Sequence, residues 1–323
     1  MIKIDLFTGF LGAGKTTLIK EYVKYLVEKG ESVCILENDH GAVNVDTMLL
    51  QDVLGENCDI ETVAGACDPD CHRRRFKTKL IAMAMSGYTH VVVEPSGIFD
   101  VDEFFDALHE DPVSKWYEAG SVIAVADARM KDDLSPTEEY IMASEIAEAG
   151  LIVFSHLEVR NSVDSALKVI RSALHSVRCE KEIGHHNILA KDREDLTPED
   201  FKRIETAGYD SCGYVKKGLA ANNDYSTIYL MDSGIEKDAL SAFSNEVFKK
   251  NEEYGKVARI KGFILKDGSW YECNITKNDT EIRHSEKGQH VIIVIGENMN
   301  EDSIIDTFKS FCPKDSKLIS MSS

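Results

Sequence analysis

The sequence lacks the marks of membrane, secreted and nucleic-acid-binding proteins. No uninterrupted apolar run approaches the roughly 18–20 residues of a membrane span, and the first residues do not have the shape of a signal peptide. Basic residues are in the minority: 37 Lys and Arg stand against 56 Asp and Glu, a net charge of −19. Binding to nucleic acid or to an anionic membrane needs a basic surface, so neither is an expected partner. We expect a soluble, cytoplasmic protein.

Disulfides are not expected either. The eight cysteines are scattered over 323 residues, and disulfide frameworks belong to short secreted chains. Cys67 and Cys71 are the one closely spaced pair, so thiol chemistry is expected only there. The chain has no internal repeat and no low-complexity tract, and it is long enough for one large domain or two ordinary ones.

Residues 1–208 alternate apolar runs of strand length with helical patterns. The first run, residues 2–7, leads through a glycine loop into a helix expected over residues 15–28. Runs without polar alternation, such as residues 89–93, suit strands that are buried on both faces. This alternation predicts an α/β fold, in which a mostly parallel sheet is covered by helices on both sides.

The pattern changes after residue 208. We interpret the polar residues 209–223 as a linker and residues 224–323 as a smaller α+β domain. Short turn sequences, among them Asp267-Gly268 and Glu286-Lys287-Gly288, separate strands there and predict antiparallel hairpins.

A phosphate-binding loop follows the first predicted strand. Residues 9–16, GFLGAGKT, match G-x-x-x-x-G-K-[ST] without a gap, between a strand and a helix as the motif requires. Its glycines let successive N–H groups face a phosphate, and the helix start adds its positive dipole end. We expect Lys15 to reach the β- and γ-phosphates, Thr16 to hold Mg²⁺ and Thr17 to lie near the α-phosphate. The expected nucleotide-binding residues of the loop are Gly9, Gly12, Ala13, Gly14, Lys15, Thr16 and Thr17.

Phosphoryl transfer also needs a carboxylate near the metal and a group that positions the nucleophile. Glu94 ends a buried run and, in a parallel sheet, lies at the same edge as the loop. It is a candidate for the Mg²⁺ shell, directly or through water, and for the attacking water, while the Gly97 N–H is a candidate for the γ-phosphate. Residues 37–41 reach this edge as a candidate switch. Asp39 in that switch joins Lys15 and Glu94 as a catalytic candidate.

Together these segments resemble the CobW-type metallochaperone GTPases, the CobW/HypB/UreG-like P-loop GTPases. The resemblance rests on the phosphate loop, on ENDHG at residues 37–41 followed by Val45-Asp46, and on EPSG at residues 94–97. Near the end, RIKGF at residues 259–263 and VIIVIG at residues 291–296 resemble two landmarks of the family's C-terminal domain. The resemblance implies a GTPase domain, a smaller C-terminal domain, and delivery of zinc, cobalt or a related metal to a client protein.

The sequence departs from the family at its metal motif. The family has Gly-Cys-x-Cys-Cys, whereas residues 65–72 here read GACDPDCH. Cys67, Cys71 and His72, with Glu37, His40, Asp68 or Asp70 as a further ligand, could still complete a tetrahedral site for Zn²⁺ or Co²⁺. Two alternatives stay open: Cys67 and Cys71 are ordinary packed residues, or the pair carries a redox function or a cluster that bridges a homodimer.

A second departure concerns the base. The family's Asn-Lys-x-Asp follows a strand, and the corresponding residues 155–158 read SHLE. Only Glu158 offers the carboxylate that would accept the guanine N1 and N2 hydrogens, and its extra methylene displaces that two-pronged contact. We therefore expect a weakened preference for GTP over ATP. The adjacent His185 and His186 are read as exposed loop residues without an assigned role.

The residues and the resemblance together predict a Mg²⁺-dependent nucleoside triphosphatase, with GTP favoured over ATP, that delivers a transition metal or metal cofactor to a client protein. One alternative is a nucleotide-gated activator or reductase with a cysteine-bound cluster at a dimer interface. Another is an ATP-using P-loop protein without a chaperone role.

Overall fold

The computed structural model describes residues 1–10, 12–39, 50, 53–64, 69–95, 101–130, 134–158, 162–210, 212–214, 225–277, 279–314 and 316–322. For residues 38, 39, 64, 69–72, 102, 103 and 225 it describes the backbone alone. The described residues form two compact units, one up to residue 214 and one from residue 225 onward. Each unit is described by itself.

The first unit is built on a seven-stranded sheet in the order β3-β2-β4-β1-β5-β6-β7. Every pair of neighbouring strands is parallel. The strands are β1 (Ile2–Thr8), β2 (Val33–Asp39), β3 (Cys58–Ala64), β4 (His90–Pro95), β5 (Tyr117–Asp127), β6 (Leu151–Ser155) and β7 (Ile188–Ala190). Because all the strands run the same way, their carboxyl ends meet at one edge, where ligands bind in folds of this kind.

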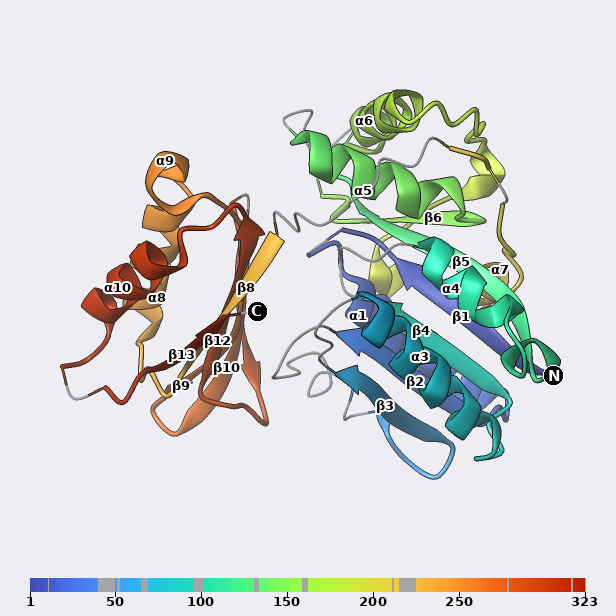
Figure 1. Cartoon of the computed structure of the whole chain (residues 1–323), viewed down its shortest axis with the longest axis horizontal. Coiled ribbons are helices and arrows are strands. Elements are labelled where there is room, and N and C mark those ends of the chain that lie inside the picture. Colours follow the sequence, from blue (N-terminus) through green and yellow to red (C-terminus); the bar gives the residue numbers. More distant parts are fainter. Residues whose placement is uncertain are drawn as a thin grey trace. The chain divides into compact units, whose positions relative to one another are not determined.

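Helices cover both faces of this sheet (Figure 1). They are α1 (Lys15–Glu28), α3 (Pro69–Ala84), α4 (Val101–His109), α5 (Pro136–Ala147), α6 (Ser162–Ser176) and α7 (Pro198–Glu205). Strand residues alternate between two cores: Val91 and Val93 of β4 pack in the core formed with α3, α4, α5 and α6, whereas Val92 packs in the core formed with α1 and α7. The predicted α/β fold with a parallel sheet between two helical layers is confirmed.

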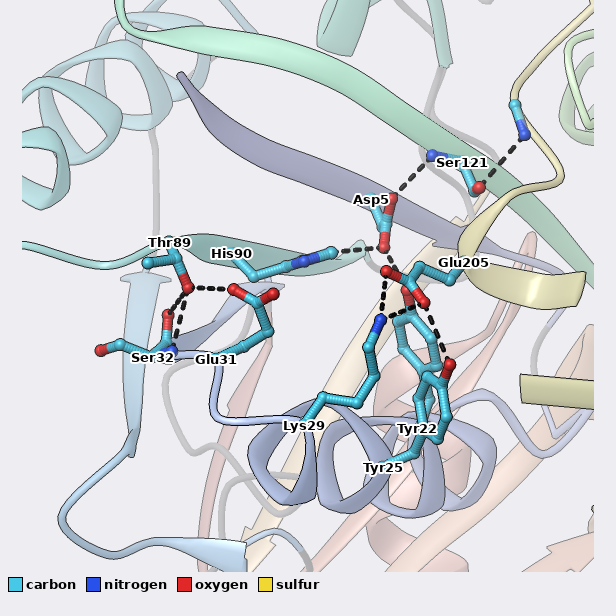
Figure 2. Close-up of polar contacts among 11 residues, drawn as sticks. Asp5, Tyr22, Tyr25, Lys29, Glu31, Ser32, Thr89, His90, Ser121 and Glu205 are labelled. Carbon is cyan, nitrogen blue, oxygen red and sulfur yellow. Dashed lines mark hydrogen bonds and ion pairs between the residues drawn. The ribbon is translucent and has the colours of Figure 1, made fainter. Parts of the chain in front are cut away.

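A buried polar network joins α1 to three strands at the middle of β1 (Figure 2). Asp5 is fully buried, and its carboxylate has contacts of 2.6 Å with the Tyr22 hydroxyl, the His90 Nε2 and the Ser121 backbone N–H. The Ser121 hydroxyl in turn accepts from the N–H of Gly208, which follows α7. One carboxylate therefore fastens α1, β4 and β5 to β1.

The second unit is an antiparallel six-stranded sheet in the order β11-β10-β9-β12-β8-β13. Its strands are β8 (Tyr225–Met231), β9 (Lys256–Lys266), β10 (Ser269–Thr276), β11 (Thr280–Ser285), β12 (Val291–Glu297) and β13 (Ile319–Ser322). The helices α8 (Lys237–Val247), α9 (Asn251–Tyr254) and α10 (Glu301–Phe311) pack on one face through residues such as Phe243 and Phe308. The predicted hairpin-rich α+β architecture is confirmed, with β13 as an additional edge strand. No helix in the described part of the chain is long and apolar enough to cross a membrane.

Candidate nucleotide site

The loop after β1 turns so tightly that it requires glycine. Gly9 has φ +136°, and a Cβ there would lie 2.2 Å from the carbonyl oxygen of Val125 on β5. Gly14 occupies the N-cap of α1 in the left-handed conformation, φ +93°, which favours glycine. The loop thus lies closely against β5 before the chain enters α1. Its geometry is that of a backbone cradle at a helix N-terminus, the arrangement that binds phosphate.

Lys15 folds its side chain back over this loop. The residue is 7% exposed, and its ammonium donates to the carbonyl oxygens of Gly9 and, at 3.4 Å, Phe10. A buried ammonium at the mouth of the cradle supplies the positive charge that a polyphosphate needs.

Two acidic side chains lie side by side at the carboxyl edge of the sheet, next to α1. The Thr16 hydroxyl donates to Oε1 of Glu94 at 2.6 Å, which joins the first turn of α1 to the end of β4. Glu37 on β2 is the direct neighbour of Glu94 in the parallel register. Glu37 is 2% exposed and Glu94 7% exposed. Carboxylate oxygens at this edge, beside the loop, are ligands that suit Mg²⁺.

A third buried acid, Glu145 on α5, approaches the loop from the other side. It is 2% exposed, and its backbone oxygen accepts from the Thr8 hydroxyl at 3.5 Å. Burial raises the pKa of the Glu145 carboxyl to about 8, while the Lys15 ammonium and a hydrogen bond with the Gly9 backbone act in the opposite direction.

Glu145 is not among the site residues predicted from the sequence. The available signal was a single charge within residues 140–147, a helical stretch that is otherwise apolar or small and that the structure buries throughout.

The ends of β5 and β6 form the neighbouring edge, where the sequence predicts base recognition. Ser155 lies next to the loop, since a Cβ added to Gly14 would be 3.8 Å from the Ser155 Cβ. His156, with φ 56°, places Nδ1 2.9 Å from the Ser155 hydroxyl and 3.5 Å from Oδ2 of Asp127. Asp127 is also paired with Arg129 at 2.9 Å. Glu158 lies in the turn beyond His156 with an exposed side chain.

Several predicted site residues fall outside this description. His40, Cys67 and Gly97 lie outside the described residues, and for Asp39, Cys71 and His72 only the backbone is described. Their roles remain predictions. Among the side chains that are described, no three His, Cys, Asp or Glu residues converge as metal ligands.

The backbone nevertheless restricts where the cysteine segment begins and ends. Strand β3 pairs with β2 up to Asp39 and Ala64, and α3 starts at Pro69. In the sequence, Cys67 therefore lies in the connection between β3 and α3. Strand β3 is the neighbour of β2, which carries Glu37. His185 and His186 are exposed, as expected, and form a short 3-10 turn whose carbonyl oxygens accept from Arg203.

The fold and this edge define a P-loop nucleotide-binding protein of the α/β class. The CobW/HypB/UreG nucleotide-binding domain matches residues 3–185, which is more than half of the chain. The chain belongs to this family, and the family resemblance seen in its motifs is confirmed.

Two curated relatives and one solved structure are similar to this chain. The zinc chaperone YeiR of Escherichia coli is 25% identical over 154 residues, covering 47% of this chain and 46% of YeiR. The zinc-regulated GTPase metalloprotein activator 1 of Schizosaccharomyces pombe is 24% identical over 184 residues, covering 55% of this chain and 44% of that protein. The chain thus spans about half the length of the curated relatives it matches. The Zn(II)-bound YjiA GTPase of E. coli aligns over 97% of this chain and 99% of its own, at 18% identity and a TM-score of 0.38.

Proposed function

We propose that this protein is a Mg²⁺-dependent nucleoside triphosphatase, with GTP as its favoured substrate, whose hydrolysis cycle controls the delivery of a transition metal to a client protein. The observation that carries the proposal is the 2.6 Å hydrogen bond between Thr16 of the loop and Glu94 of β4. It joins the element that binds the phosphates to the element that ends in a buried carboxylate.

The donor set at this edge fits Mg²⁺. Hard oxygen ligands suit the ion, which usually takes one or two carboxylates together with phosphate oxygens and water. The Thr16 hydroxyl and the Glu94 carboxylate are the residues that would hold it, with Glu37 adjacent on β2. When bound there, Mg²⁺ would supply neutralisation of the phosphate charge during transfer.

The remaining steps fall to the chain itself. The backbone N–H groups of the loop, including those of Gly12, Ala13 and Gly14, bind the phosphates. Lys15 exchanges its carbonyl partners for β- and γ-phosphate oxygens. Thr17 lies in the first turn of α1, beside the expected α-phosphate. Glu94, or Asp39 on the switch, orients the attacking water, and the Gly97 N–H binds the γ-phosphate.

The base is recognised at the ends of β5 and β6. Ser155 and His156 occupy the places of the family's Asn and Lys, beside Asp127. Glu158 is exposed, so it can accept the guanine N1 and N2 hydrogens only where the nucleotide itself covers it. This supports a modest preference for GTP, with ATP as a competing substrate.

Zn²⁺ or Co²⁺ is the proposed cargo. Cys67, Cys71 and His72 would bind it, and Glu37 or His40 would complete a tetrahedral set. Glu37 supports the coupling because it lies on β2 between Glu94 of β4 and the end of β3, from which the cysteine segment departs. A change at the γ-phosphate can therefore alter the metal's ligands. The named relatives that are zinc chaperones support the choice of metal, and a homodimer and an unidentified metal-dependent client complete the proposal.

Two measurements on the purified full chain test this function. The first is binding and hydrolysis of Mg·GTP by the wild type, by Lys15→Ala, which should lose tight binding, and by Lys24→Ala. The control changes an exposed lysine of the same helix that pairs with Glu21, and it should behave as the wild type. Absence of nucleotide binding in the wild type would overturn the proposal.

The second measurement is a Co²⁺ titration in the diphosphate and triphosphate states. We expect thiolate charge-transfer absorption from about one ion per chain, lost in Cys67→Ser/Cys71→Ser and kept in Cys273→Ser. Linkage requires the metal to change nucleotide affinity by the factor by which the nucleotide changes metal affinity. Equal absorption in the double variant would rule out this cargo site while leaving the nucleotide site intact.

A further inference from the structure

Two cysteines outside the predicted metal segment have sulfur atoms in close contact. The Sγ atoms of Cys179 and Cys212 lie 2.8 Å apart, although 33 residues separate them in the sequence. A disulfide holds its sulfurs at about 2.05 Å. Less than 1 Å of movement therefore converts this contact into a bond.

Cys179 is fixed by the end of α6. The helix closes with Arg178 in the left-handed conformation, φ 56°, and the Cys179 N–H donates to the Leu174 carbonyl at 2.9 Å. This is the Schellman type of helix end, which fixes the backbone on both sides of the turn. Cys179 itself is 7% exposed and belongs to the larger core of the first unit.

Cys212 is held opposite by a separate set of contacts. Tyr209 bridges to Ala149, and the Asp210 N–H donates to the Glu148 carbonyl at 3.0 Å. Lys181, two residues after Cys179, forms an ion pair of 2.6 Å with Asp210, two residues before Cys212. The Lys181 side chain is 3% exposed. The backbone on each side of the sulfur contact is therefore fastened independently of the sulfurs.

The two thiols differ in access. Cys212 is half-buried, whereas Cys179 is buried and its pKa is raised to about 11, mainly by that burial and by Cys212. An oxidant arriving from solvent meets Cys212 first. Cys179 is then already in position to react with the oxidised sulfur.

We propose that Cys179 and Cys212 form an oxidisable dithiol that closes to an intramolecular disulfide when a peroxide reacts at Cys212. The Cys212 thiolate attacks one oxygen of the peroxide and the O–O bond breaks, which gives a sulfenic acid at Cys212 and releases hydroxide. The hydroxide takes up a proton and becomes water. The Cys179 sulfur then attacks the sulfenic sulfur, the S–S bond forms, and the sulfenic oxygen leaves as water. Two thiols and one hydrogen peroxide give one disulfide and two waters, and a small dithiol reductant reverses the reaction.

The disulfide would tie down the last described segment of the first unit, which contains Cys212. Residues 209–214 include the contacts of Tyr209 and Asp210 with the turn between α5 and β6, and Tyr214 packs against Tyr140 with ring centroids 6.4 Å apart. A disulfide from Cys212 to the end of α6 would add a covalent tie to this segment. Cross-links of this kind stabilise chiefly by restricting the unfolded chain.

Peptide mapping of the oxidised full chain tests the proposal. Reduced protein, freed of metal by a chelator, is treated with a small excess of hydrogen peroxide, alkylated and digested. We expect one linked peptide that joins Cys179 to Cys212, in the wild type and in Cys273→Ser, whose cysteine is buried in β10. In Cys179→Ser a sulfenic-acid trap should label Cys212. Dithiothreitol should remove the link.

Two outcomes would overturn the proposal, and both can be read on the wild type alone. One is oxidation of Cys212 to the sulfinic acid without a link to Cys179. The other is a linked peptide that joins either cysteine to a different partner, such as Cys67 or Cys71. As a second readout, we expect oxidation to raise the thermal midpoint of the wild type by several degrees and to leave that of Cys179→Ser unchanged.

Discussion

Strand β1 has a buried acid, Asp5, in its middle and the phosphate loop at its carboxyl end, and the two places accommodate charge differently. In the middle of the strand, the carboxylate of Asp5 has three contacts of 2.6 Å, all from the chain itself (Figure 2). At the carboxyl end, Glu37 and Glu94 are neighbours in the register, and the Thr16 hydroxyl bonds to Glu94.

This difference distinguishes a network that stabilises the fold from a site that is proposed to bind a ligand. Asp5 is surrounded by donors, so its charge is compensated within the fold. The burial of Tyr22, together with the nearby Asp5 carboxylate, raises the pKa of the Tyr22 hydroxyl, which stays protonated as a donor to Asp5. Glu37 and Glu94 instead lie at the edge of the parallel sheet where ligands bind, next to the first turn of α1. Carboxylate oxygens at such an edge are ligands that suit Mg²⁺.

The largest expected effect is on stability and comes from Asp5, in the middle of β1. Asp5→Ala removes the acceptor of the Tyr22 hydroxyl, His90 and the Ser121 N–H in a fully buried place. We expect a loss of about 3–5 kcal/mol in the free energy of unfolding, measured in urea.

The control for Asp5→Ala is Glu205→Gln, which weakens the half-exposed pair with Lys29 and should cost about 1 kcal/mol or less. Nucleotide affinity of the folded Asp5→Ala protein should equal that of the wild type. A stability loss no larger than that of the control, or a drop in nucleotide affinity, would mean that the Asp5 network and the phosphate loop are not separate in function.

The second effect is on turnover and comes from the carboxyl end. Glu94→Gln keeps an oxygen that can accept from Thr16 but removes the charge, so nucleotide binding should change by a few-fold and hydrolysis should fall by about 100-fold or more.

Glu61→Gln serves as the control for Glu94→Gln, because Glu61 lies in the same sheet on β3, beyond β2, where it pairs with Lys79 at a partly exposed place. Single-turnover rates and urea unfolding of the three proteins decide the matter. Wild-type turnover in Glu94→Gln would remove the role proposed for this carboxylate.

Local rules explain why so much of the fold was predictable. The bounds predicted for α1, residues 15–28, agree with the structure. Asp267 and Gly268 adopt φ angles of 51° and 79°, as a tight hairpin turn requires. Such features depend on neighbours in the sequence. The strands β7 and β13 were missed because they have three and four residues, too few for a periodic pattern.

The site was only partly predictable for a related reason. The phosphate loop is one contiguous motif, so the sequence alone located it. The approach of Glu145 to Gly9 and Lys15 depends on how α5 packs over the sheet, and no spacing in the sequence reports that. The contact between Cys179 and Cys212 likewise joins two segments that only the tertiary fold brings together.

The third effect concerns pH and Glu145, whose pKa is raised by burial to about 8 from an ordinary value near 4.5. Between these two values the folded protein keeps a proton that the unfolded chain has lost, so this carboxyl lowers stability as the pH rises. The Glu145→Gln variant has no titrating carboxyl at this position, so it lacks this loss of stability at rising pH. Its stability relative to the wild type should therefore increase from pH 5 to pH 8, by about 1–3 kcal/mol.

Urea unfolding of nucleotide-free protein at several pH values tests the role of Glu145. The control is Glu139→Gln, a change of the same type in the first turn of the same helix. Above pH 8 the ionised carboxylate also competes with phosphate for Lys15, so nucleotide affinity of the wild type should weaken there and that of Glu145→Gln should not. Parallel pH profiles for the wild type and Glu145→Gln would contradict this role.

The smallest expected effect concerns the choice of base. A buried carboxylate with a two-pronged contact to guanine discriminates strongly, because its loss leaves buried polar groups without partners. Glu158 is exposed, and His156, which stands in place of the family's lysine, is turned toward Ser155 and Asp127. Adenine presents an acceptor at N1 and is still repelled by an ionised carboxylate. We therefore expect GTP to be preferred over ATP by about tenfold or less, which corresponds to about 1.4 kcal/mol.

Glu158→Gln should reduce even this preference, whereas Glu180→Gln, a change of an exposed acid in the same domain, should not. Competition of GTP and ATP for one preparation of each protein measures the ratio. A preference for GTP above about a thousandfold would show that other residues read the base, and a clear preference for ATP would show that Glu158 faces away from it.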